Sequence, residues 1–147
     1  MKDVHIVVGS VAIAVNGLAG LYGAWVWWRV QPSSAWFWRI LRAGQAIVVV
    51  QAVLGGVLLL THHKAPGLHV LYGVLPLLVA FIAEQLRLAA AQMVLDSRGY
   101  QSADQVGALP EDEQRSIVVA ILRREVGVMT LSALVVVGLL ARAAGTG

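Results

Sequence analysis

Histidine is the residue type in this chain best suited to hold a metal ion or a cofactor, and the four histidines are unevenly placed. Three of them, His62, His63 and His69, lie in the stretch THHKAPGLHVLYG at residues 61–73, and His5 lies far away near the start of the chain. Imidazole nitrogen is a ligand for zinc, for copper and for haem iron. The chain has no cysteine, which excludes a thiolate metal site, a cysteine nucleophile and a disulfide.

The segments that must position these histidines are long and apolar. Hydrophobic residues make up 59% of the sequence and charged residues 13%, whereas a soluble domain carries about 25% charged residues. A helix needs about 20 apolar residues to cross a membrane, and the sequence lacks the alternation typical of barrel strands. We therefore predict an all-α polytopic membrane protein, a four-transmembrane-helix bundle that forms a single integral membrane domain over residues 1–147. The predicted helices cover about residues 4–28, 35–61, 68–98 and 110–144.

Basic residues are distributed unequally between the two ends of the predicted helices. Eight of them flank one side: Arg29, Arg39, Arg42, Arg87, Arg98, Arg115, Arg123 and Arg124. Three flank the other side: Lys2, Lys64 and Arg142. The positive-inside bias puts the first side in the cytoplasm, so we expect an N-out/C-out protein of the plasma membrane with its histidines on the extracytoplasmic side. The pI of 9.8 reflects these flanks, which favour anionic lipid as a partner and give no reason to expect nucleic acid.

Tryptophan is confined to the predicted cytoplasmic end of the first two helices. The five residues are Trp25, Trp27, Trp28, Trp36 and Trp38. We interpret them as an interfacial belt, because indole rings favour the level of the lipid headgroups.

Small and polar residues recur at helical spacing on three of the predicted helices. The rows are His5, Gly9, Ala12, Asn16, Ala19 and Gly23; Gly44, Val48, Gln51, Gly55, Leu58 and His62; and His69, Gly73, Pro76, Ala80, Glu84 and Arg87. In a membrane such rows face the interior of the bundle, where close packing and hydrogen bonds are available. His63 is rotated away from its row and is expected in the loop or at the rim.

Glycines accompany the inward-facing histidines. Gly9 and Gly73 each follow a histidine by one helical turn, and Gly55 lies nearly two turns from His62. A glycine leaves a flat gap against the helix, which a planar macrocycle ligated by a neighbouring imidazole could fill. The core of a helical bundle is a usual place for haem.

These patterns lead to a hypothesis about function. We predict a small membrane b-type cytochrome that binds haem b near the extracytoplasmic face, with His5 and His69 as axial ligands. Gln51 is expected at the edge of the haem and Lys64 near a propionate. Electron transfer with a quinone or a respiratory-chain protein is the expected activity, and a homo-oligomer is compatible with the pattern.

The stretch VVVQAVLGGVLLLTHHKAPGLHVLYGVLPLL, residues Val48–Leu78, resembles one half of haem A synthase. In that family an apolar helix with Gln and Leu-Gly-Gly leads through a short outer loop to a helix that carries a haem-ligating histidine, which His69 matches. The family has eight helices and an earlier Glu-x-x-His, where this chain has four predicted helices and reads WRILRAGQ. The resemblance thus implies a haem-binding four-helix bundle and not the synthase reaction.

Two alternatives belong to other functional classes. The first is an extracytoplasmic copper or zinc site made by His5, His69 and either His62 or His63, since imidazole suits both metals. The second is an accessory subunit of a membrane complex without any cofactor, in which the polar rows serve helix packing. No hydrolase or transferase motif supports an enzyme of those classes.

Glu84 is an acidic residue inside a predicted membrane helix, and it needs a partner. Glu84 is fifteen residues beyond His69, or about 22 Å along a helix. A buried charge is costly without an opposite charge. We expect a structural ion pair between Glu84 and Arg123 or Arg124.

Overall fold

The protein is an all-helical bundle in which four helices are long and apolar enough to cross a membrane. The computed structural model describes residues 1–29, 34–61 and 64–147. The four long helices are α1 (Lys2–Trp28), α2 (Ala35–Leu60), α3 (Gly67–Leu88) and α6 (Glu111–Ala144), and the shorter α4 (Ala90–Ser97) and α5 (Ala103–Gly107) lie between α3 and α6. The fold class predicted from the sequence is confirmed, and the apolar helices make this a multi-pass membrane protein.

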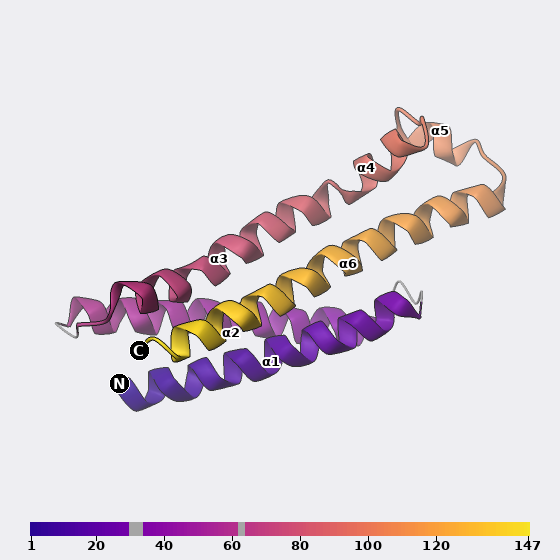
Figure 1. The fold of residues 1–147 in the computed structure, drawn as a ribbon. Helices are drawn as coiled ribbons and strands as arrows, with labels where there is room; N and C mark the ends of the chain where they lie inside the picture. The colour runs from indigo at the N-terminus through magenta and orange to yellow at the C-terminus, as the bar shows by residue number, and fades with distance from the viewer. Residues whose placement is uncertain (30–33, 62–63) are drawn as a thin grey trace.

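The four long helices form a closed ring in cross-section. Helix α1 packs against α2 and α6, and α3 packs mainly against α6 and more lightly against α2. Both termini lie at one end of the bundle, where α2 ends and α3 begins (Figure 1). We call this the histidine end, because His5 and His69 lie in the first turns of α1 and α3.

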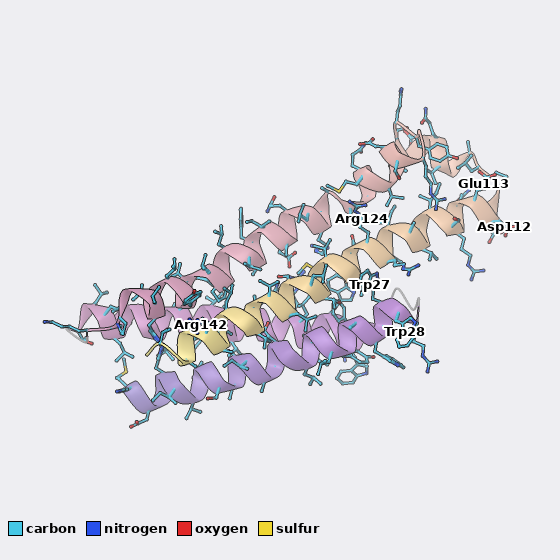
Figure 2. The ribbon with its side chains drawn as sticks, in the orientation of Figure 1. Trp27, Trp28, Asp112, Glu113, Arg124 and Arg142 are labelled. Carbon is cyan, nitrogen blue, oxygen red and sulfur yellow. The ribbon has the colours of Figure 1, made fainter. Side chains whose placement is uncertain are left out.

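The opposite end of the bundle carries the tryptophans. Trp27 and Trp28 lie at the end of α1 that is remote from Arg142 (Figure 2). Trp36 and Trp38 belong to the first turn of α2, which starts at this same tryptophan end. Ser34 caps α2, since its hydroxyl accepts the amide hydrogen of Phe37 at 3.3 Å, as expected for a serine N-cap.

The interior of the bundle combines small side chains of α1 with larger apolar side chains of α2 and α6. Ala12 and Ala19 of α1 are fully buried, as are Phe37 of α2 and Met129 of α6. Asn16 is also buried, and its side-chain amide donates to the carbonyl of Ala12 at 2.8 Å and to that of Gly44 at 3.3 Å. The small and polar row of α1 therefore faces inward, because that is where its polar group finds partners.

Part of the chain extends beyond the ends of α1 and α2. Helices α4 and α5 and the start of α6 lie there, and Asp112 and Glu113 are at the far tip (Figures 1 and 2). Val94 and Leu95 of α4 pack with Ile117 of α6 in a small apolar cluster of their own. Gly99, with φ of 79°, ends α4, and such a positive φ is what glycine allows.

The segment predicted as one helix over 68–98 is divided. Helix α3 ends at Leu88, and Ala89 has ψ of −8°, outside the helical value near −42°. The residues around Ala89 are good helix formers, so the sequence carries no signal for this break. The bend follows from packing, because it lets α4 place Ala90 and Val94, both buried, toward α6.

Candidate functional site

His5 and His69 meet at the histidine end, although 64 positions separate them in the sequence. Their ring centroids are 6.1 Å apart and their planes are inclined by 57°. They come from α1 and α3, which lie on opposite sides of the four-helix ring, so the two imidazoles face each other across the bundle interior. Each side chain is partly buried.

The ring of His69 is oriented by the last turn of α6. Its Nδ1 lies 2.9 Å from the carbonyl oxygen of Ala143. A carbonyl can only accept, so Nδ1 carries the hydrogen and neutral His69 has its lone pair on Nε2. The same arrangement fixes metal-binding histidines in proteins, where the second ring nitrogen donates to a backbone carbonyl. His69 is therefore already oriented to offer Nε2 to a ligand.

His5 is held by Gln51 of α2. Their Nε2 atoms are 3.2 Å apart, so the amide donates and His5 accepts. Among the described residues, Nδ1 of His5 and Oε1 of Gln51 are buried without a hydrogen-bond partner. An unpaired buried polar group costs about 1–3 kcal/mol of folding free energy. Both unpaired atoms belong to the two side chains that touch each other, His5 and Gln51. A neutral His5 that accepts at Nε2 carries its hydrogen on Nδ1. The cluster therefore keeps one free donor, Nδ1 of His5, and one free acceptor, Oε1 of Gln51, for a polar group.

The glycines predicted to leave a gap have different surroundings. A Cβ at Gly9 would lie 2.8 Å from Nε2 of Gln51, and one at Gly55 would lie 3.2 Å from Cε1 of His5. These two glycines thus make room for the glutamine and the histidine themselves. At Gly73, an added methyl group would meet no described atom within 4 Å beyond its own helical turn, so the space beside this glycine is open.

The other predicted ligands are His62, His63 and Lys64. His62 and His63 lie outside the described residues, and Lys64 is exposed at the histidine end. No group of three or more histidine, aspartate or glutamate side chains within residues 1–29, 34–61 and 64–147 is arranged to hold a metal ion. The described part of the site thus offers two imidazole ligands.

A second polar site lies on the α2–α3 side, toward the tryptophan end. Glu84 forms ion pairs with Arg42 of α2 and, at 2.9 Å, with Arg87 of α3, and it accepts from Gln45 at 3.1 Å. The expectation of an ion pair at Glu84 is confirmed, but the predicted partners were wrong. Arg123 and Arg124 are exposed on α6; α3 turns Glu84 toward α2 instead. Sequence spacing fixes the depth of a helical residue but not which neighbouring helix it faces.

A small cavity lies between these two sites. Its volume is about 10 Å³, and its polar lining comes from Asn16, Gln45 and Ser132. That volume accommodates about one water molecule. The cavity is therefore too small for a cofactor, and it places polar groups of α1, α2 and α6 around one point in the core.

Comparisons with known protein families, with characterised proteins and with solved structures found no match to this chain. The chemistry of the site is therefore the basis for assigning a function.

Proposed function

We propose that this protein is a small membrane b-type cytochrome that holds haem between His5 and His69. The observation that carries the proposal is the pair of facing imidazoles, with ring centroids 6.1 Å apart. Two imidazoles that bind one metal ion from opposite sides have centroids about 6 Å apart, since each metal–nitrogen bond is about 2 Å. The spacing suits one shared metal centre.

The number of ligands favours haem over a bare metal ion. Zinc in proteins takes about four ligands, three of them from the protein even in catalytic sites. Haem iron takes four nitrogens from the macrocycle and needs only two axial ligands from the protein. His5 and His69 supply two, and no third ligand of the usual kinds joins them among the described residues.

The surroundings support the same assignment. Ala143 fixes the ring of His69 through Nδ1, as an orienting partner of a ligating histidine does. His5 would offer a lone pair to the iron once the Gln51 amide leaves Nε2 or turns so that its Oε1 accepts there. The unfilled space beside Gly73 is where the edge of a macrocycle would find room. Lys64 is the cation available for a propionate, as expected from the sequence.

When bound, haem supplies one-electron redox chemistry. His5 and His69 would hold the group, and the bundle around them would keep part of the site away from water. We infer electron exchange with a quinone or a respiratory-chain protein at the extracytoplasmic face of the plasma membrane, the orientation favoured by the distribution of basic residues. Electron transfer places no further demand on catalytic side chains.

A copper or zinc site is the second candidate. Its specific support is the sequence neighbourhood of His62 and His63, which lie between α2 and the start of α3. A site of this kind would need at least one of them in addition to His5 and His69. The metal site therefore requires His62 or His63, whereas the haem site requires neither of them.

The test is the visible spectrum and the metal content of the full chain, produced with ample haem and purified in detergent. Oxidised protein should show a Soret band, and dithionite should bring out sharp α and β bands. His5→Ala and His69→Ala should each weaken or abolish these bands. His62→Ala and His63→Ala are matched controls that should leave them unchanged.

Each other outcome has a definite meaning. Protein without a Soret band but with stoichiometric zinc or copper that is lost in His62→Ala or His63→Ala would replace the cytochrome by the metal site. Protein with neither haem nor metal would favour the interpretation as an accessory subunit without a cofactor. A full haem spectrum in His69→Ala would show that the ligand pair is wrong.

A further inference from the structure

The polar site between α2 and α3 contains two arginines, one carboxylate and an aromatic ring. Glu84 accepts from Nε of Arg87 at 2.9 Å and pairs with Arg42. Both guanidinium groups also lie over Trp38, with their central carbons 5.9 Å (Arg42) and 5.7 Å (Arg87) from the ring centroid. We call Arg42, Glu84, Arg87 and Trp38 the seam cluster, because they join two helices that otherwise pack lightly.

The charges of the seam cluster do not cancel. Two guanidinium groups face one carboxylate, which leaves a net charge of +1. The side chain of Arg42 is 47% exposed, and those of Glu84 and Arg87 are 24% exposed. A positive group with exposed donors therefore remains on the surface of the bundle.

The surface around the seam cluster is apolar. Phe81, Leu86 and Leu88 of α3 are 62%, 42% and 64% exposed, which is suited to lipid chains. Arg87 lies twenty residues after the start of α3, or about 30 Å along the helix axis, close to the thickness of the hydrocarbon core. If the start of α3 lies at one membrane surface, the cluster lies at the headgroup level of the other.

An uncompensated positive charge beside lipid needs an anion. At this depth the available anions are lipid phosphates, and guanidinium groups match phosphate oxygens in geometry. We propose that the seam cluster binds the headgroup of an anionic phospholipid, with Arg42 and Arg87 at the phosphate and Glu84 limiting the affinity. This site is separate from the histidine pair and does not depend on a bound haem.

The test uses the full chain in nanodiscs that contain equal amounts of phosphatidylglycerol and phosphatidylcholine. The protein is then extracted in mild detergent, and the lipids that remain bound are quantified by native mass spectrometry. We expect phosphatidylglycerol to be enriched about fivefold, the effect of one net charge near a membrane surface. Arg42→Gln and Arg87→Gln should each bring the ratio close to one.

Two further variants separate a lipid site from a structural ion pair. Glu84→Gln raises the net charge of the cluster and should increase the enrichment above that of the wild type; a decrease would overturn the proposal. Arg39→Gln is the matched control. Arg39 lies over Trp36 at 5.2 Å at the same end of α2, so an equal loss in this variant would show general attraction to the tryptophan end and no specific site.

A final arm identifies the source of the phosphate. In nanodiscs of phosphatidylcholine alone, added inorganic phosphate should not protect the protein against thermal unfolding. Replacing half of that lipid by phosphatidylglycerol should protect it. Equal protection by both would show a site for free anions and contradict the lipid assignment. Arg42→Lys keeps the charge and should retain part of the enrichment, which keeps the test decisive if a glutamine variant unfolds.

Discussion

Gly23 lies where α1 contacts both α2 and α6. The residue is buried, and a Cβ added to it would lie 2.5 Å from Cε2 of Phe37 and closer still to the hydroxyl of Thr130. Neither neighbour can move easily, since Phe37 is 0% and Thr130 1% exposed. Gly23→Ala should therefore strain the bundle.

The size of the effect follows from two opposing contributions. Overpacking a core costs about 1–3 kcal/mol, and replacing glycine by alanine in a helix returns up to about 1 kcal/mol. We expect Gly23→Ala to lower the free energy of unfolding by about 1–2 kcal/mol. Gly138→Ala is the matched control on α6, because no described atom beyond its own turn lies within 4 Å of the added methyl. It should be neutral or stabilising.

The assay is reversible unfolding in mixed micelles by titration with sodium dodecyl sulfate, followed by circular dichroism. A second variant adds a test. Phe37→Leu removes the ring that meets the new methyl group, so this substitution should lower the free energy of unfolding less in the Gly23→Ala protein than in the wild type. Equal or higher stability of Gly23→Ala relative to Gly138→Ala would refute the close approach of the three helices described above.

Three further changes test other parts of the bundle. Asn16→Leu removes a donor shared by two backbone carbonyls and should lower the free energy of unfolding by about 1 kcal/mol, the magnitude of hydrogen bonds between membrane helices; an unchanged titration midpoint would contradict this. Thr130→Val removes a buried hydroxyl that has no partner among the described residues, so unfolding should become harder by up to about 1 kcal/mol, and any clear loss of stability would count against the described packing. Gly55→Ala places a methyl group 3.2 Å from Cε1 of His5 and should lower the haem content per protein measured by pyridine haemochrome absorption. Gly56→Ala, whose methyl meets no described atom within 4 Å, should not.

The four spanning helices could be predicted from the sequence because a bilayer demands long apolar segments. The buried side of α1 was also predictable, since small and polar residues recur at helical spacing and Asn16 needs partners inside the bundle. The break at Ala89 could not be predicted, because it depends on how α4 meets α6 and not on local helix preference.

The candidate site could be predicted only in outline. The meeting of His5 and His69 follows from two helices that begin at one end of the bundle with a histidine on the inner face. The role of Gln51 as the partner of His5 is a matter of rotation and distance between α1 and α2, which spacing along one helix does not contain. The same limit explains why Arg42 was not foreseen as the partner of Glu84.

Helix α6 has a consequence for how the protein is made. Half of its apolar stretch is buried, against 11% for α2 and for α3, and it packs against both α1 and α3. It is also the fourth long helix along the chain, and synthesis proceeds at about 5–20 residues per second. For the seconds before α6 leaves the ribosome, α1 and α3 stand in the membrane without the helix against which each of them packs most extensively. Assembly of the bundle, and with it the joining of His5 to His69, is therefore a late event in biosynthesis that depends on delivery of this one helix.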